Sequence, residues 1–325
     1  MVDFGAKDVP IARKQEMVGE VFKSVAPSYD VMNDLMSIGM HRMWKNHLVG
    51  HMLRPFAGQR HLDVAGGTGD VGVRVARAIL AAERAEGWRA ATAGAAPTSK
   101  RAEAGLGGVT VLDINPAMLA EGRRRAADDA SLDDVCRSAR PVLRADETGF
   151  VEGNAETLEN LPDAEFDSYT IAFGMRNVPQ RERALAAAHR VLKPGGRFLC
   201  MEFSPHVWVS LGSKQPPYAT PPIAPADVAN FASLPLPRTP AAAAEAVATS
   251  VAQLGYDAYS YGAVPAIGAA VAGDAASYQY LVESIRRFPD AHGFAAMVRA
   301  AGFVNVTITP IAPGGVVAVH SGIKL

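Results

Sequence analysis

Short apolar runs alternate with longer amphipathic stretches through most of the chain, a pattern typical of a parallel sheet with helices on both faces. Strands that end in polar residues are predicted at 60–65, 109–113, 150–152, 166–173 and 197–203. Near-helical spacing predicts helices at 13–55 (with a break at 26–28), 71–80, 116–129, 181–192, 277–288 and 294–301. Two last strands, at 304–309 and 316–320, are expected to form a hairpin. The predicted fold is a doubly wound α/β sheet with N-terminal helices.

Three stretches interrupt this pattern and predict insertions into one domain. Residues 86–108 are rich in Ala and Gly, residues 129–148 are polar and irregular, and residues 205–250 are rich in Pro and Ala. Such compositions are typical of mobile or low-complexity segments, and regular sequence resumes at Tyr256. We expect a helical cap over 1–55, an α/β core over 56–204, a low-complexity insertion over 205–250 and the rest of the same domain over 251–325.

Glycines gather between the first predicted strand and its helix, in the stretch RHLDVAGGTGDV. Gly66, Gly67 and Gly69 allow a tight turn and the close approach of a ligand, and the next helix turns free N–H groups toward that turn. The spacing differs from G-x-G-x-x-G, and Asp63 would repel a pyrophosphate. This arrangement favours a cationic ligand without phosphate, such as S-adenosylmethionine (SAM), over NAD. A plain tight turn is the alternative.

Polar side chains stand at or just past the ends of the five core strands: Asp63, Asp113, Asn154, Arg176 and Glu202. Ligands of doubly wound sheets bind outside the carboxyl ends of the strands. We therefore expect these five residues to surround one site.

Two of these strand ends have alternative roles. Asp113 is placed to accept both ribose hydroxyls of a nucleoside, or to cap the helix that begins at Pro116, although Asn115 is the better cap. The turn 153–156 can read an adenine edge or serve as a simple loop.

Composition excludes several classes of protein. The formal net charge of −1 gives no electrostatic reason to expect nucleic acid as a partner. The two cysteines, Cys136 and Cys200, have no metal-ligand spacing and indicate a reducing compartment without a metal site. No apolar run reaches the roughly 20 residues that span a bilayer. The N-terminus lacks the apolar core of a signal peptide, and its acids argue against a transit peptide.

A Met-rich segment, SYDVMNDLMSIGMHRMWKNHL, carries polar residues within its apolar pattern. A pair of amphipathic helices packed on the domain explains the methionines and Trp44. Tyr29, Asp30 and His41 interrupt the apolar face, and a Met-lined surface suits a bulky apolar ligand.

Two long motifs carry a resemblance to a known family: YDVMNDLMSIGMHRMW at 29–44 and RVLKPGGRFLCMEFS at 190–204. LDVAGGTGD, FGMRNV, SYQYLVESIRRFP and VVAVHSGIKL agree as well. The chain resembles the ubiquinone/menaquinone-biosynthesis C-methyltransferases of the UbiE type, and among them the mitochondrial benzoquinol methylases. The resemblance covers nearly everything except the three predicted insertions. It implies a class I SAM-dependent methyltransferase fold, with a Rossmann-like, mostly parallel sheet of seven strands whose last strand is antiparallel.

The resemblance also implies where the methyl donor binds. In the family the contacts fall at the positions of Thr68, Asp113, Asn154 and Ala155. The glycine stretch adds Asp63, Gly66 and Gly69 to the predicted cofactor site. Many bacterial members have serine where this chain has Ala172, so a hydroxyl contact expected there is absent.

The implied reaction methylates a ring carbon of 2-methoxy-6-polyprenyl-1,4-benzoquinol in ubiquinone biosynthesis. An aromatic carbon is a poor nucleophile until a ring hydroxyl ionises, so Arg176 is predicted to hold the phenolate charge. Asn177 is expected to orient the ring or Arg176. Tyr29, Asp30 and His41 are candidates for proton transfer, and His41 has the most suitable unperturbed pKa; a core or surface histidine is the alternative.

Other readings stay open. A demethylmenaquinone or phylloquinone-type naphthoquinol methyltransferase would use the same chemistry, and a non-catalytic SAM-fold subunit of a quinone-synthesis complex would use none. The apolar tail predicts peripheral membrane association, with the Met-rich helices and the segment near Tyr278 as the entrance. The resemblance implies the matrix side of the mitochondrial inner membrane and membership of a multi-subunit complex; a homodimer is also considered.

Overall fold

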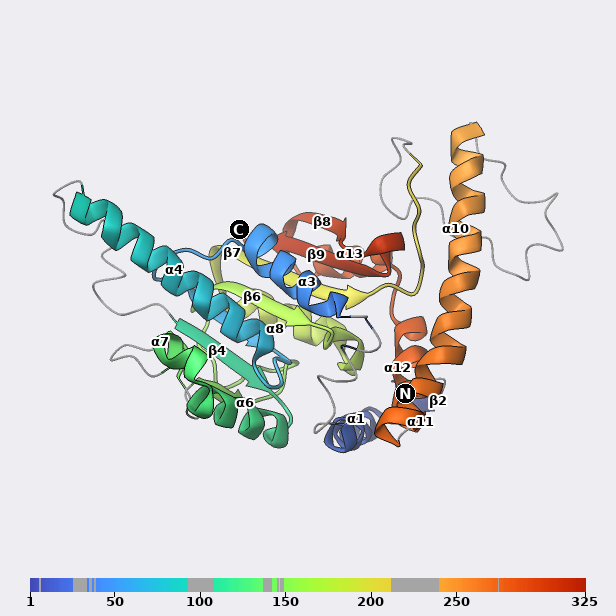
Figure 1. Cartoon of the computed structure of the whole chain (residues 1–325), viewed down its shortest axis with the longest axis horizontal. Coiled ribbons are helices and arrows are strands. Elements are labelled where there is room, and N and C mark those ends of the chain that lie inside the picture. The colour runs from blue at the N-terminus through green and yellow to red at the C-terminus, as the bar shows by residue number, and fades with distance from the viewer. Residues whose placement is uncertain are drawn as a thin grey trace.

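The chain is described by a computed structural model that covers residues 1–5, 7–25, 34, 37, 39–92, 108–136, 142–144, 146, 149–211, 240–273 and 275–325. Figure 1 shows these residues around one central twisted sheet, with helices on both faces and the long helix α10 standing upright at one side. The arrangement is the layered α/β fold that the alternating sequence pattern predicts.

Seven strands form the central sheet, in the spatial order β5-β4-β3-β6-β7-β9-β8. They are β3 (Arg60–Val64), β4 (Gly108–Asp113), β5 (Phe150–Glu152), β6 (Phe166–Ala172), β7 (Leu192–Phe203), β8 (Val304–Pro310) and β9 (Val317–Ile323). Neighbouring strands from β5 to β7 are parallel, whereas β9 is antiparallel to β7 and β8. The predicted sheet is confirmed, and so is the closing hairpin, whose turn holds the 3₁₀ helix η7 (Pro313–Gly315).

Helices pack on both faces of the sheet. One face carries α3 (Met40–His47), the π-helix η2 (Leu48–Leu53), α4 (Asp70–Thr92) and α6 (Pro116–Asp128). The other carries α8 (Arg181–Val191), α13 (Ala291–Ala300) and the 3₁₀ turn η4 (Met175–Asn177). Because side chains alternate along a strand, β7 gives Leu199 and Met201 to the first core and Phe198 and Cys200 to the second.

The first two predicted insertions are shorter than expected. Helix α4 continues to Thr92, so the Ala-rich start of the segment 86–108 is helical, and 93–107 lies outside the described residues. The segment 129–148 contains the 3₁₀ helix η3 (Ala130–Leu132) and α7 (Asp133–Cys136). Val135 is fully buried there and belongs to the core beside α4. The apolar residues of this segment are spaced too irregularly to predict a helix, although they fill the core.

The third predicted insertion ends earlier than expected. Helix α10 (Pro240–Ala258) begins 16 residues before Tyr256, and it continues into the π-helix η6 (Tyr259–Ala263), α11 (Val264–Ala272) and α12 (Ala275–Arg287). Its alanine run looks like low complexity in the sequence, but alanine has the highest helix propensity. Residues 212–239 lie outside the described part. None of the described helices is long and apolar enough to span a bilayer.

Side chains of α10 hold the extended segment that follows β7. Alternate backbone N–H groups of this segment donate to residues one turn apart on α10: Val207 to Gln253 (2.8 Å), Val209 to Thr249 (3.2 Å) and Leu211 to Glu245 (2.6 Å). The polar residues of α10 therefore replace a neighbouring strand for this segment.

The N-terminal cap is not purely helical. Strands β1 (Val2–Phe4) and β2 (Lys7–Val9) form an antiparallel hairpin before α1 (Ile11–Val25). Three-residue strands leave too few positions for a periodic signal, so the sequence pattern did not predict them. The hairpin packs on α12, where the ring of Phe4 stacks on Tyr280 with centroids 4.4 Å apart.

Candidate active site

The carboxyl ends of β3, β4 and β6 open into one cavity of about 450 Å³, which α1, α3, η6 and α12 close. The predicted site residues that line it are His41, Asp63, Gly66, Thr68, Asp113, Asn154, Ala155, Arg176 and Asn177. Among the others, Tyr29 and Asp30 lie outside the described residues, and Gly69 and Glu202 do not line the cavity. The topology thus brings residues from five separate parts of the sequence into one site.

The glycine loop wraps around the end of β3 because several of its residues adopt positive φ. Gly67 has φ of +55° and donates its N–H to Asp113 Oδ2 at 2.8 Å. A side chain at Gly66 would begin 2.7 Å from Val111 Cγ1 and 2.9 Å from Asp63 Oδ2. Only glycine fits at this position, and the loop therefore lies close against both acidic strand ends.

Gly69 has a different place from the one predicted. It has φ of +81°, and a Cβ there would lie 2.8 Å from the ring of Phe150. Gly69 faces the core beneath the loop and not the cavity. A glycine is required at this position for packing, and the sequence alone does not distinguish a glycine needed for packing from one that contacts a ligand.

Asp113 presents a carboxylate that is held by the backbone at the tip of β4. Its oxygens accept the N–H groups of Gly67 and Asn115, both at 2.8 Å. Burial raises the pKa of Asp113, and these backbone N–H groups oppose that rise. Asn115 caps α6 by accepting the N–H groups of Ala117 and Met118. The capping role thus belongs to Asn115, and Asp113 remains available to the cavity.

Asp63 lies deeper than Asp113 and is 1% exposed. Its Oδ2 accepts the N–H of Gly72 at 2.9 Å, in the first turn of α4, and its Oδ1 accepts the Thr170 hydroxyl at 2.7 Å. Burial raises the pKa of Asp63 to about 7, although both hydrogen bonds and the nearby Lys45 lower it. The Asp63 side chain therefore braces the glycine loop from below.

The turn after β5 carries two predicted cofactor contacts. Asn154 Oδ1 accepts the N–H of Glu156 at 2.9 Å, and the preceding Gly153 donates its N–H to the carbonyl of Asp113 at 3.0 Å. These bonds fix Asn154 and Ala155 beside the tip of β4, where both line the cavity.

Arg176 forms a buried ion pair that the sequence does not predict. Its Nη1 donates to Glu202 Oε1 at 2.9 Å, and its backbone N–H contacts Glu202 Oε2 at 3.3 Å. The two side chains are 6% and 1% exposed. Nη1 also donates to the carbonyl of Phe173 at 2.5 Å, whereas Nε is buried and has no partner among the described residues. Arg176 is therefore fixed and charge-compensated, not a lone cation.

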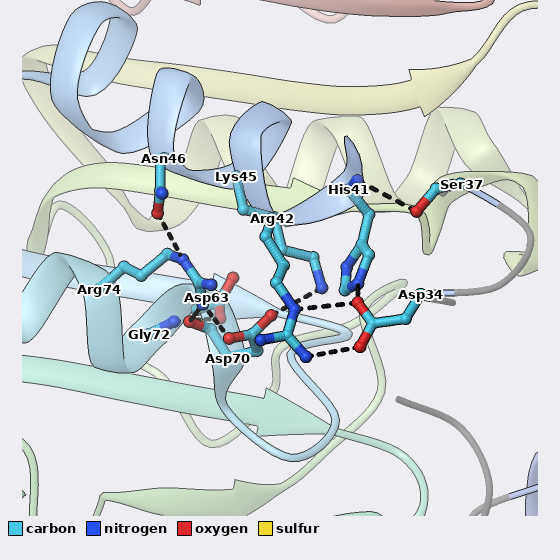
Figure 2. A network of polar contacts seen from close by, with 10 residues as sticks. All are labelled: Asp34, Ser37, His41, Arg42, Lys45, Asn46, Asp63, Asp70, Gly72 and Arg74. Carbon is cyan, nitrogen blue, oxygen red and sulfur yellow. Dashed lines mark hydrogen bonds and ion pairs between the residues drawn. The ribbon is translucent and has the colours of Figure 1, made fainter. Parts of the chain in front are cut away.

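Figure 2 shows two acidic groups that hold the polar side chains of α3. Asp34 accepts from His41 Nε2 at 2.7 Å and from Arg42 at 2.5 and 2.9 Å, and these partners lower its pKa to about 2. His41 Nδ1 is buried and has no partner in the described part. Burial lowers the pKa of His41, which its bond to Asp34 opposes. The ring is thus a neutral base held in a fixed orientation.

Lys45 is a site residue that the sequence predictions missed. It is 8% exposed, lines the cavity and donates to Asp70 Oδ2 at 2.7 Å, as Figure 2 shows. Its position four residues after His41, on the same face of the helix, was the available signal.

Asn177 is oriented from outside its own turn. Its Oδ1 accepts the hydroxyl of Tyr280, at 3.0 Å, from helix α12. Tyr280 also stacks on Phe4 of the N-terminal hairpin. The 103-residue separation between Asn177 and Tyr280 explains why sequence spacing gave no sign of this contact.

The cavity fits the predicted cofactor at the strand ends. The carboxylates of Asp63 and Asp113 suit a ligand with positive charge, and Gly66 and Gly67 line the cavity without a side chain, so a ligand can approach the backbone closely. Met118 Cε lies 3.1 Å from the position of a Cβ at Gly67 and provides an apolar wall. A sulfonium nucleoside has this combination of charge and apolar surface.

Comparison with known proteins identifies the family. The model of the ubiE/COQ5 methyltransferase family matches residues 11–220 and 244–324. A ubiquinone/menaquinone biosynthesis C-methyltransferase UbiE of Methylobacterium nodulans is 46% identical over 99% of this chain and 96% of its own length. The mitochondrial 2-methoxy-6-polyprenyl-1,4-benzoquinol methylase of Oryza sativa is 42% identical over 99% of this chain and 88% of its own length.

A solved structure from Thermotoga maritima, described as a SAM-dependent methyltransferase and possible histamine N-methyltransferase, matches with a TM-score of 0.49. It is 14% identical and covers 94% of this chain and 99% of its own. The family match and the observed sheet order confirm the expected class I methyltransferase fold and SAM as the cofactor. The chain belongs to the ubiE/COQ5 methyltransferase family.

Proposed function

We propose that this chain transfers a methyl group from SAM to a ring carbon of 2-methoxy-6-polyprenyl-1,4-benzoquinol in ubiquinone biosynthesis. The observation that carries the proposal is that one cavity joins the acidic strand ends to Arg176, Asn177 and His41. We assign Asp63, Gly66, Thr68, Asp113, Asn154 and Ala155 to the cofactor half of the cavity. The names of the relatives from Methylobacterium nodulans and Oryza sativa support the substrate class.

The chemistry requires a charged ring oxygen close to the methyl donor. When bound, SAM supplies an electrophilic methyl group, and the ring carbon attacks it only after a ring hydroxyl ionises. Arg176 is our candidate for stabilising that oxygen, because this residue lines the cavity and Glu202 fixes the orientation of its guanidinium. A preorganised donor needs no rearrangement during the reaction. The pairing with Glu202 reduces the net charge at this point, so the contribution of Arg176 is directional more than ionic.

The ring proton has to leave after methyl transfer, and His41 is our candidate to accept it. His41 carries its proton on Nε2 and donates it to the Asp34 carboxylate, so the buried Nδ1 keeps a lone pair that has no partner among the described residues. The carboxylate also stabilises the imidazolium that forms. The Tyr280 hydroxyl holds Asn177, which we assign to orienting the quinol ring.

Two alternatives use the same cavity differently. A naphthoquinol would be methylated by the same groups, and the name of the relative from Methylobacterium nodulans includes both ubiquinone and menaquinone biosynthesis. A non-catalytic subunit of a quinone-synthesis complex would not need the fixed Arg176–Glu202 and His41–Asp34 pairs, and their presence favours an enzyme.

We also propose that the protein works at a membrane surface, on the matrix side of the mitochondrial inner membrane, within a multi-subunit complex or as a homodimer. A polyprenyl tail has to be drawn from a lipid phase. Exposed Val247, Val251 and Leu254 on α10, next to the cavity wall at Tyr256, support contact with lipid. The mitochondrial relatives of Oryza sativa and Arabidopsis thaliana support the compartment. Failure to sediment with liposomes, with and without partner proteins, would contradict the membrane role.

A direct assay tests the proposed reaction and the role of Arg176. Short-chain benzoquinol and naphthoquinol acceptors are incubated with labelled SAM, and we expect the benzoquinol to be methylated with the higher kcat/KM.

Arg176→Ala is expected to bind SAM but lose most turnover. Because loss of one partner of a buried ion pair can cost about 3–5 kcal/mol, Arg176→Lys is the second variant, with an expected loss in kcat of about 100-fold. Arg183→Lys, on the exposed side of α8, is the control, and unchanged turnover in Arg176→Lys would remove Arg176 from the mechanism.

A further inference from the structure

We propose that His61 is a positioning residue for the SAM site: it completes a one-way chain of hydrogen bonds that ends on Asp63 and keeps this carboxylate ionised beneath the glycine loop. The inference rests on the proposal that Asp63 belongs to the methyl donor's site. The other members of the chain, Gln59, His61, Ser168 and Thr170, do not line the cavity, and the proposed reaction does not use them.

The pairing of β3 with β6 places the members of the chain. In this register His61 lies opposite Ser168, and Asp63 lies opposite Thr170. Because residues two apart on a strand share a face, all four side chains point the same way. They are at most 1% exposed, so each polar atom has to find its partner within the protein.

The distances give a continuous path from one end of β3 to the other. Gln59 Nε2 lies 2.5 Å from Ser168 Oγ, which lies 2.7 Å from His61 Nδ1. His61 Nε2 lies 3.0 Å from Thr170 Oγ1, which lies 2.7 Å from Asp63 Oδ1. Four hydrogen bonds therefore connect the Gln59 amide to the Asp63 carboxylate.

The number of protons on each group determines which atom donates in each hydrogen bond, beginning at Gln59. Gln59 Oε1 accepts the N–H of Phe56 at 3.0 Å, so the amide nitrogen has to face Ser168. Ser168 Oγ accepts from that nitrogen and donates its only proton to His61 Nδ1. His61 is then protonated on Nε2, from which it donates to Thr170. Burial lowers the pKa of His61 to about 3, in agreement with a neutral ring that donates at one nitrogen and accepts at the other.

The last hydrogen bond of the path, from Thr170 to Asp63, determines which protonation state of Asp63 the path favours. Thr170 Oγ1 accepts from His61 and donates its single proton to Asp63 Oδ1. If Asp63 were protonated on Oδ1 and donated to Thr170, Thr170 Oγ1 would either leave its own proton without an acceptor in this path or donate it to His61 Nε2. In the second case Ser168 Oγ would face N–H groups from both Gln59 and His61, and its own proton would have no acceptor in the path. Hydrogen bonds in one direction polarise one another, so the chain favours the ionised form of Asp63, the form that suits a sulfonium ligand.

Other charges also act on Asp63, and the test has to separate them. Lys45 on α3 lowers the pKa of Asp63, Asp113 on β4 raises it, and the charge of Asp63 in turn raises the pKa of Tyr169 on β6. The N–H of Gly72 on α4 is an uncharged donor. A change confined to Thr170 or His61 leaves all of these in place.

The test is the pH dependence of SAM affinity, measured by calorimetry on the full chain between pH 6 and 9, with no quinol present. Thr170→Val and His61→Phe remove one link each. A rise of about one unit in the pKa of Asp63 lowers its ionised fraction at pH 7 roughly fivefold. We expect a weakening of SAM binding of that size at pH 7, disappearing by pH 9. The amino group of SAM titrates alike with every variant, so differences between variants belong to the protein.

Matched variants distinguish a specific effect on Asp63 from a general disruption of the fold. Thr170→Ser restores the last link, and Tyr169→Phe removes a buried hydroxyl outside the chain; both are expected to keep the wild-type profile. If Thr170→Val weakens binding equally at every pH, or leaves the profile unchanged, the inference is overturned. If Asp63→Asn binds SAM as the wild type does at every pH, the proposed place of Asp63 fails and the inference fails with it. An Asp63→Asn variant that loses the pH dependence, beside an unshifted Thr170→Val, defeats the hydrogen-bond chain alone.

Discussion

Single residues in the cavity owe their chemical character to charged partners that fix their orientation. Glu202 fixes Arg176, Asp34 fixes His41, and Asp70 holds Lys45. The pattern of apolar and polar residues placed both residues in the site. Arg176 follows the end of a predicted strand, and His41 interrupts the apolar face of a predicted helix. The pattern could not predict that Glu202 is the partner of Arg176, because these two residues meet only through the pairing of β6 with β7.

The residue-scale prediction concerns His41. His41→Gln is expected to lower kcat by about 100-fold or more, because general bases typically contribute that much, and to leave the affinity for SAM unchanged. Since burial lowers the pKa of His41, its neutral form persists below pH 6.5, and the rate should fall only at lower pH. The pH profile of kcat measures this. His47→Gln, exposed on the same helix, should behave as wild type; an unchanged kcat in His41→Gln would assign the proton to another group.

Among the elements, the unit β3–glycine loop–α4 was the most predictable from sequence. A buried strand, three glycines and a periodic helix leave few alternatives, and the predicted strand and helix starts agree with β3 and α4. Two of the helical stretches that the prediction missed are Ala-rich: the end of α4 and the start of α10. Alanine carries no amphipathic signal, so a helix there cannot be told from a low-complexity segment by periodicity.

At this scale the glycines of α4 and its loop give a matched pair. Gly69→Ala is expected to lower the free energy of unfolding by about 2 kcal/mol, because the added Cβ meets Phe150 at 2.8 Å and φ is +81°. Gly87→Ala, within α4 and with open space around it, should raise it by about 0.5–1 kcal/mol. Urea denaturation measures both. Equal effects of the two substitutions would contradict the packing role given to Gly69.

The whole molecule assembles its site from segments that are far apart in the chain. Helices α1, α3 and α12 close a cavity whose floor is made by strand ends from the central core. The parallel sheet with helices on both faces followed from the alternation of elements. The N-terminal hairpin and its contact with Tyr280 did not, because short strands and long-range ring contacts leave no periodic trace. Stability at this scale depends on both cores, including the histidine buried beneath α13.

The molecule-scale prediction is a pH effect on stability through His320. It is 3% exposed, and its Nε2 donates to the carbonyl of Ala291 at 2.8 Å. Burial lowers the pKa of His320 to about 4. Between pH 6.5 and 4 the unfolded chain binds a proton that the folded chain does not, so stability falls as pH falls.

The measurement compares wild type with His320→Phe. From pH 7 to 5, His320 should cost the wild type roughly 2 kcal/mol of unfolding free energy. The difference between wild type and His320→Phe should therefore shrink by that amount, and His292→Phe, one residue from Ala291, serves as a comparison. A difference that stays constant with pH would mean that His320 has the same pKa in the folded and the unfolded chain.

The central claim is that methyl donor and quinol share the cavity at the ends of β3, β4 and β6. The most direct test is a crystal structure of the chain with S-adenosylhomocysteine and a short-chain benzoquinol analogue. We predict the adenosine beside Asp113 and Asn154, and the ring next to Arg176 and His41 with its acceptor carbon about 4–5 Å from the sulfur, the room that one methyl group needs in a near-attack arrangement. Nucleoside and ring bound in separate, unconnected places, or a nucleoside away from Asp113, would contradict the account.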